Sequence, residues 1–330
     1  MSIDVKQASP RVLGALAAGS LASIQPTTFR AEDGAQLVDD FHAAFGKHRA
    51  RANHAKGVIL EGSFVPTDDA SALSKAAVFA GPPVPVTIRF SDFGGIPDIP
   101  DNIGEANPRG LAIKFRSGSD ADLDVVTHSF NGFPTATADG LGMLLRAIGS
   151  SGPGVAKPTA LDKFLESHPI AKKFLTTQNP PPVSYATTAY FGVNSVAFID
   201  AKSERHFLRY RFVPEAGEHY LDEATRNSKG PNYLSEEIAK RIATTPIRFD
   251  WFAQLAESGD KVEDPSIAWP ETRTLVKLGT IRVERIAPDQ TTADRSLLFM
   301  PGAFPNGIEA ADPMFAVRNA AYSVSFGERQ

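Results

Sequence analysis

The sequence predicts an α+β fold built on an antiparallel β-barrel or sheet with helices around it. Two observations favour this fold. Several segments alternate apolar and polar residues with a period of two, which is typical of strands that have one polar face. These segments follow one another across loops rich in Gly, Pro and Asp, without the regular crossover helices that a parallel sheet needs. One face of the sheet is therefore expected to meet water or to line a polar cavity.

The expected elements run in order along one domain. Residues 1–35 are expected to form an N-terminal arm or short helix, and residues 36–330 a single domain. Leu37, Val38, Phe41 and Phe45 recur at the spacing of a helix face. Clear period-two alternation predicts strands at 57–64, 84–90, 111–115, 207–213 and 280–286. Helices are predicted at 141–148, 160–177, 234–242 and 313–326, and proline-rich loops near 97–108, 180–182 and 265–270.

Composition narrows the possible partners. Lys and Arg total 34 against 38 Asp and Glu, so there is no basic excess to bind nucleic acid. The chain has no cysteine, which excludes disulfides and Cys-ligated zinc. No stretch approaches the ~18 apolar residues of a spanning helix, so no membrane partner is expected. Residues 12–24 loosely resemble a signal peptide but lack a clear cleavage site. A cytoplasmic location is expected, with the periplasm left open.

The familiar catalytic signatures are missing, and a different set of polar segments stands out. There is no HExxH zinc motif, G-x-S-x-G elbow, Walker A loop or Rossmann fingerprint. Charged and polar residues instead occupy strand-like contexts where apolar residues are usual. These segments are RANHAKG at 51–57, RFS at 89–91, NPRGLAIKF at 107–115, VTHSFNGFP at 126–134 and RNAAY at 318–322.

In this order the segments resemble the haem catalase superfamily, and most closely its short members, the catalase-related peroxidases. The resemblance is collinear from about Phe41 to the end of the chain, and it includes DPSIAWP at 264–270 and the segment 301–322. It implies a catalase-like antiparallel β-barrel with surrounding helices and a long wrapping loop. It also implies ferric haem b as the cofactor.

The resemblance assigns the iron ligand to Tyr322. Arg318 precedes it by four residues, so on a helix the two side chains share one face, about 6 Å apart at Cβ. A guanidinium beside the phenol oxygen favours the phenolate, which is a hard anionic donor for ferric iron.

Three residues are expected to act on the opposite haem face. His54 would carry a proton between the two peroxide oxygens, and Ser91 would hydrogen-bond its ring. The family's distal amide is assigned to Asn131, in a segment about two residues longer than its counterpart. A displaced amide would weaken peroxide disproportionation more than simple reduction. His128 and His206 are expected to be core or loop residues, with His128 near the distal pocket.

The resemblance assigns the haem propionates to Arg51 and Arg89, with Arg329 as a third candidate. Arg suits this task because its guanidinium pairs with carboxylates in a bidentate manner. Arg51 lies three residues before His54, so a twist or bulge must redirect it if both stand in one strand. The apolar sides of the haem are assigned to Phe133, with Leu141, Met143 and Leu144.

The function implied is a haem-dependent peroxidase that reduces hydrogen peroxide and organic hydroperoxides with an electron donor, with weak catalase activity. Eight residues follow Tyr322, which implies accessible haem and a smaller oligomer than the large catalases form, a homodimer. Two alternatives stay open: a hydroperoxide-rearranging haem protein like the allene oxide synthases, and a non-catalytic haem-binding barrel.

Overall fold

The computed structural model describes residues 31–118 and 121–330 of the chain. Most of the expected arm at 1–35, and all of the signal-like segment at 12–24, lie outside the described residues. The described part opens with helix α1 (Ala31–Phe45), where a helix was predicted. No helix among the described residues is long and apolar enough to cross a membrane.

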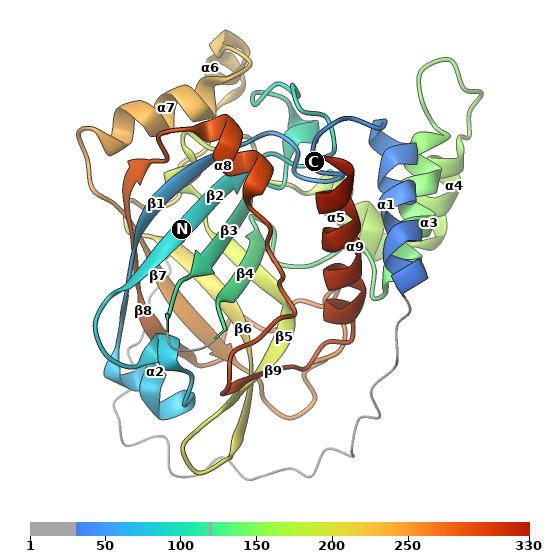
Figure 1. Cartoon of the computed structure of the whole chain (residues 1–330). Helices are drawn as coiled ribbons and strands as arrows, with labels where there is room; N and C mark the ends of the chain where they lie inside the picture. The colour runs from blue at the N-terminus through green and yellow to red at the C-terminus, as the bar shows by residue number, and fades with distance from the viewer. Residues whose placement is uncertain (1–30, 119–120) are drawn as a thin grey trace.

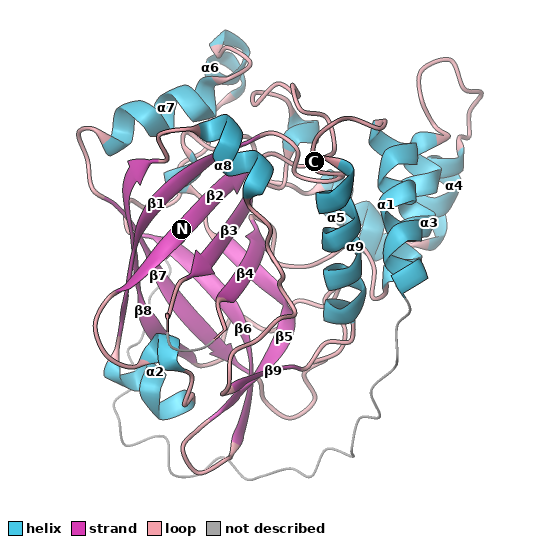
Figure 2. Cartoon of the chain, viewed as in Figure 1, coloured by secondary structure: helices cyan, strands magenta, loops and turns pink. Residues whose placement is uncertain are grey.

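Eight antiparallel strands form a closed barrel, as predicted (Figures 1 and 2). Their order is β4-β3-β2-β1-β8-β7-β6-β5, and the pairing of His128 with Phe191 joins β4 to β5. A short ninth strand, β9 (Ile308–Ala310), adds to the outer edge of β5. The barrel strands are β1 (Gly57–Pro66), β2 (Val84–Ser91), β3 (Gly110–Phe115), β4 (Leu123–His128), β5 (Tyr190–Ile199), β6 (Arg205–Pro214), β7 (Ile247–Leu255) and β8 (Leu275–Ile286).

Aromatic side chains fill the barrel. Trp251 is fully buried and packs at ring-centroid distances of 4.9 Å from Phe115, 5.2 Å from Phe64 and 5.4 Å from Phe212. Rings that meet at these distances leave no room for a cofactor between them. The polar cavity expected on one sheet face must therefore lie on the outside of the barrel.

Helices cover that outer face. Helix α9 (Met314–Glu328) lies along the barrel, and α1 packs against both α9 and α3 (Ala138–Gly149). Gly34 permits the close approach of α1 to α9, because a Cβ at this position would overlap Ala320 of α9. The remaining helices are α2 (Asp68–Leu73), α4 (Ala160–Ser167), α5 (Pro169–Thr176), α6 (Glu223–Ser228), α7 (Tyr233–Ile242) and α8 (Gln290–Ser296).

Several features differ from the sequence prediction. The single helix predicted at 160–177 is two helices, α4 and α5, which meet at His168. Pro169 lacks a backbone N–H and restricts the residue before it, so it can begin a helix but not continue one. Strands β5, β7 and β9 and helices α2, α6 and α8 were not predicted, and of β4 only residues 126–128 were expected in a strand-like context.

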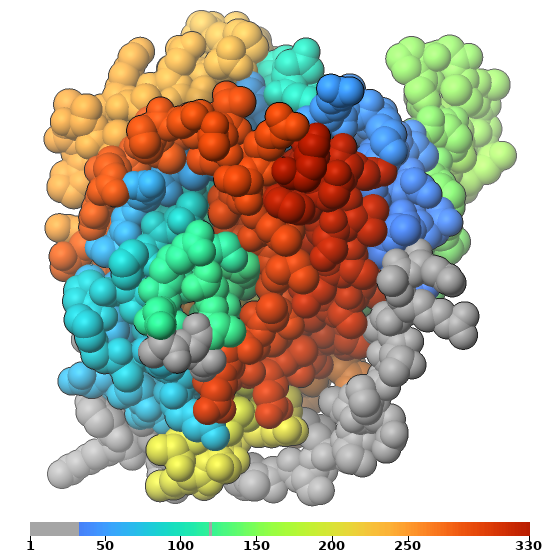
Figure 3. Space-filling model, in the orientation of Figure 1, coloured from blue at the N-terminus to red at the C-terminus, as the bar shows by residue number. Residues whose placement is uncertain are grey.

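The wrapping loop of the predicted fold is the connection between β8 and α9. It starts with α8, runs down the barrel wall to β9 and then turns into α9, forming a continuous outer layer on the face shown in Figure 3. Gln290 docks α8 on β1: its Oε1 accepts from the Ile59 N–H at 2.8 Å, and its Nε2 donates to the Ile59 carbonyl at 2.7 Å.

Candidate active site

A cavity lies between the outer face of the barrel and helices α1 and α9. Its volume is about 170 Å³. Alternation along the strands determines its barrel wall: Phe90, Ile113 and Val125 point into the barrel core, while their neighbours point outward. The outward residues that line the cavity are Arg89, Ser91, Gly110, Ala112, Val126 and His128. The helical wall consists of Leu37, Val38 and Phe41 from α1 and Met314, Arg318, Ala321 and Tyr322 from α9.

The structure brings nearly all of the predicted site residues to this one cavity. Those that line it are Arg51, His54, Arg89, Ser91, Phe133, Arg318, Tyr322 and Arg329. Leu141 also lines it, whereas Met143 is 50% exposed and Leu144 packs in a separate cluster with Phe164. Met143 and Leu144 are therefore not cavity residues.

Asn131 is the exception among the predicted site residues. Strand β4 ends at His128, and the longer segment that follows carries Asn131 away from the cavity. Its Nδ2 donates to Glu271 Oε1 at 3.0 Å, and the same carboxylate binds Arg211 at 2.5 and 3.0 Å. Asn131 therefore does not line the cavity, contrary to the prediction that it is the distal amide.

His54 lies in an irregular segment before β1, not in a strand as expected. Its φ of +54° is a left-handed conformation that a residue with a side chain rarely adopts. Asn53 Oδ1 supports this turn by accepting from the N–H of His54 at 2.9 Å and of Gly94 at 3.0 Å. The turn lets Arg51 and His54 both face the cavity, so no strand bulge is needed.

The His54 ring is held beside Ser91 and is kept neutral. Its Nδ1 lies 3.1 Å from Ser91 Oγ. Burial, followed by the electrostatic effects of His128 and Arg89, lowers the pKa of His54 to about 3. At neutral pH the ring is uncharged and can accept a proton.

A chain of side chains supports the phenol of Tyr322. Arg318 Nη2 donates to the Tyr322 hydroxyl oxygen at 3.4 Å, as the four-residue spacing predicts. Arg318 Nη1 donates to Asn194 Oδ1 at 2.5 Å, and Asn194 Nδ2 donates to Asp312 Oδ2 at 2.8 Å. Asn194 and Asp312 were not predicted. For Asn194 the available signal was a polar residue within the apolar run GVNSVAF.

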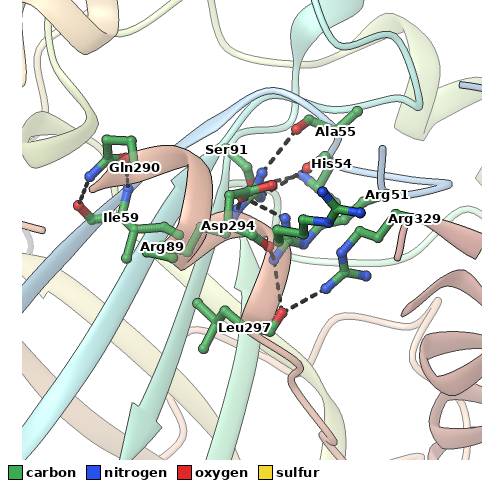
Figure 4. Close-up of polar contacts among 12 residues, drawn as sticks. Arg51, His54, Ala55, Ile59, Arg89, Ser91, Gln290, Asp294, Leu297 and Arg329 are labelled. Atoms are coloured by element: carbon green, nitrogen blue, oxygen red, sulfur yellow. Dashed lines mark hydrogen bonds and ion pairs between the residues drawn. The ribbon is translucent and has the colours of Figure 1, made fainter. Parts of the chain in front are cut away.

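Three buried guanidinium groups gather around one carboxylate (Figure 4). We call Arg51, Arg89, Arg329 and Asp294 the arginine cluster. Asp294 Oδ1 lies 2.5 Å from Arg51 Nη1 and 2.9 Å from Arg89 Nε. Arg51 and Arg329 both donate to the Leu297 carbonyl, at 3.0 and 2.7 Å, while Arg89 also holds the carbonyls of His54 and Ala55. Asp294 was not predicted, because α8 was not recognised.

The arginine cluster carries an excess of positive charge. Within residues 31–118 and 121–330, Arg51 and Arg89 form ion pairs with the Asp294 carboxylate alone, and Arg329 forms none. Burial, followed by repulsion from Arg89, lowers the pKa of Arg51 to about 9, and burial lowers that of Arg329 to about 10. In the part of the chain that the structure describes, the buried Nε of Arg329 has no hydrogen-bond partner. Three positive charges and one negative charge leave an excess of two, which suits a ligand with two carboxylates.

Comparisons with known proteins agree with this geometry. The family model described as Catalase matches residues 30–329. The chain is 32% identical to a catalase-related peroxidase of Synechococcus elongatus over 89% of this chain and 88% of that protein. It is 36% identical to one of Mycolicibacterium paratuberculosis over 88% of this chain and 92% of that protein. A fungal catalase structure superposes with a TM-score of 0.75 at 20% identity, covering 85% of this chain and 59% of that one.

Proposed function

The chain belongs to the catalase family and is an oxidoreductase that acts on peroxide, and from that premise we propose that it is a haem b peroxidase. It would reduce hydrogen peroxide and organic hydroperoxides with an external electron donor, with weak catalase activity. The observation that carries the proposal is one cavity lined by both the His54–Ser91 pair and the Arg318–Tyr322 pair. Neither the rearranging protein nor the non-catalytic barrel is favoured, because the relatives at 32% and 36% identity are catalase-related peroxidases.

The residues present fit haem, which the family binds. The two-charge excess of the arginine cluster matches two propionates, and the unpartnered Nε of Arg329 is a donor ready for one of them. Tyr322, with Arg318 beside it, would provide an oxygen ligand for ferric iron. Leu141, Phe133 and Val126 provide apolar contacts in the same cavity.

His54 and Ser91 have different roles in the proton transfer. Bound haem supplies the iron at which the O–O bond of the peroxide is cleaved. His54 accepts the proton from one peroxide oxygen and returns it to the other, which leaves as water or an alcohol. The Ser91 hydroxyl at Nδ1 orients the ring, so that Nε2 is the nitrogen left for this transfer. Arg318 holds the Tyr322 oxygen in place with the hydrogen bond from its Nη2.

Tyr322→Phe tests the proposal, because it removes a single oxygen atom. We expect haem affinity to fall at least about tenfold, since the variant loses a metal ligand. The absorbance ratio of haem to protein after purification measures the effect. Tyr220→Phe is the matched control, because Tyr220 bonds Glu218 and Asn179 and does not line the cavity. Unchanged haem content in Tyr322→Phe would remove this residue from the proposal.

The substrate and partners are part of the same proposal. Turnover of cumene hydroperoxide and hydrogen peroxide, each with and without a donor, separates donor oxidation from oxygen release. We expect donor oxidation with both peroxides and slow oxygen release with the second. We also propose a homodimer in the cytoplasm, which sedimentation of the haem-loaded protein and cell fractionation would check.

A further inference from the structure

His128 occupies a place in the cavity that none of the proposed steps uses. It is the last residue of β4, and its ring lines the cavity, packed against Phe133 and Phe174 at centroid distances of 6.2 and 6.1 Å. Its Nε2 is buried and has no hydrogen-bond partner among residues 31–118 and 121–330. Buried polar atoms in folded proteins almost always have a partner, so an unpaired one beside a cavity calls for a ligand.

The contacts of the ring determine which nitrogen carries the proton. The Phe130 backbone N–H donates to His128 Nδ1 at 3.4 Å, so Nδ1 is the acceptor. A neutral imidazole has one donor and one acceptor, which places the proton on Nε2. Burial, followed by the charge of Arg318, lowers the pKa of His128 to about 3, so the ring stays neutral. The unpartnered atom is therefore an N–H donor.

Strand register places this donor beside His54. Ser91 pairs with Gly110 across β2 and β3, and Gly110 pairs with His128 across β3 and β4. Directly paired residues point to the same face, with Cβ atoms about 4.5–5.5 Å apart. At Gly110 there is no side chain, and the His54 ring occupies that space: a Cβ there would lie 2.8 Å from His54 Nδ1. The His54 ring thus lies in one row between Ser91 and His128.

We propose that the Nε2–H of His128 is the second distal group of this site, donating a hydrogen bond to the bound peroxide. It takes the role that the sequence analysis gave to Asn131, whose amide is bound to Glu271. His54 moves the proton from one peroxide oxygen to the other, and His128 keeps its own proton throughout. A fixed donor stabilises the negative charge that develops on the leaving oxygen as the O–O bond breaks. This inference rests on the proposed peroxidase function.

Substitutions at His128 and Asn131 distinguish the two candidates. Fluoride is a suitable probe for the haem-loaded protein, because it binds ferric haem and accepts hydrogen bonds but transfers no proton. We expect His128→Phe and His128→Leu to weaken fluoride binding about tenfold, the effect of one hydrogen bond of ~1.4 kcal/mol. The rate of reaction with hydrogen peroxide should fall about a hundredfold. His128→Gln, which retains an N–H donor, should restore most of both.

Two control variants show whether the loss of fluoride affinity is specific to His128. Asn131→Ala should change fluoride affinity less than about twofold, and so should His206→Gln, a histidine that bonds Asp200 outside the cavity. Wild-type fluoride affinity in both donor-free variants, or a tenfold loss in Asn131→Ala, would overturn the inference. Haem content is measured on every sample. If the proposed peroxidase function is wrong, the wild-type protein itself will lack haem or leave peroxide intact, and this outcome is distinct from failure of the inference about His128. Should both donor-free variants misfold, the ¹⁵N spectrum of histidine in the wild-type protein decides, because a proton on Nδ1 of His128 contradicts the proposal.

Discussion

Two clusters of buried charge adjoin the active site, and they differ in charge balance. The arginine cluster draws Arg51 and Arg89 from just before His54 and Ser91, and it has three positive charges to one negative. A second group, the balanced cluster, draws Lys56 and Asp92 from just after them. The balanced cluster consists of Lys56, Asp92, Asp101 and Arg109, with ion pairs Lys56–Asp101 and Arg109–Asp92.

The difference separates a scaffold from a binding site. In the balanced cluster each charge has an opposite partner, and Tyr185 and the Leu234 N–H add hydrogen bonds to the two carboxylates at 2.8 and 2.7 Å. Breaking such a set leaves an unpaired charge in the interior, which is costly. In the arginine cluster the imbalance exists before any ligand binds, so removing one guanidinium relieves repulsion. The balanced cluster should hold the fold together, and the arginine cluster should hold a ligand.

The largest expected effect is in the balanced cluster. Arg109 and Asp92 are both fully buried, so Arg109→Met leaves the Asp92 carboxylate unpaired. We expect the free energy of unfolding to fall by about 3–5 kcal/mol. Urea unfolding followed by circular dichroism measures this. Arg205→Met is the matched control, since Arg205 and Glu309 form an exposed pair whose loss should cost less than about 1 kcal/mol. A loss in Arg109→Met no larger than the control's would remove the distinction between the clusters.

A smaller effect should appear in the pH dependence of stability. Burial, followed by the nearby Asp92 carboxylate, raises the pKa of Asp101 to about 6, against an unfolded value near 3.8. The folded state therefore binds more protons between about pH 4 and 6, and this group lowers stability as pH rises through that window. Asp101→Asn should flatten the decline by up to roughly 3 kcal/mol. Unfolding curves at pH 4, 5, 6 and 7 provide the test, and parallel profiles for variant and wild type would contradict it.

The smallest effect on stability is expected in the arginine cluster. Arg329→Met should leave the unfolding free energy of the haem-free protein within about 0.5 kcal/mol, because it removes a charge that is in excess. Haem affinity should nevertheless fall about tenfold, since one charge-assisted pair is lost. Haem titration and unfolding of the same sample measure both. A loss of stability as large as that of Arg109→Met would show that the arginine cluster is also scaffold.

Sequence patterns predicted the features that depend on local periodicity and on motifs in a fixed order. The strands 84–90 and 111–115 alternate visibly because one face enters the aromatic core and the other faces helices or the cavity. Strand β5 was missed because it is buried almost throughout, so it reads as a continuous apolar run without a period. The turn at His54 was missed because a single left-handed residue leaves no periodic trace.

The site residues show the same limit. Tyr322 and Arg318 were found because four residues on one helix suffice to bring them together. Asp294 could not be predicted, since its role depends on α8 docking against β1 through Gln290. Asn131 was misplaced because a motif cannot show that β4 ends three residues earlier, and His128 was undervalued because an unpaired ring nitrogen appears only in three dimensions.

The walls of the cavity come from segments far apart in the sequence. Arg51 and His54 leave the ribosome well before Tyr322 and Arg329. Tight capture of the porphyrin must then wait until α9 has been synthesised and has docked against α1. Loading would be a late event in biogenesis, and a nascent chain stalled before α9 has left the ribosome should be without colour.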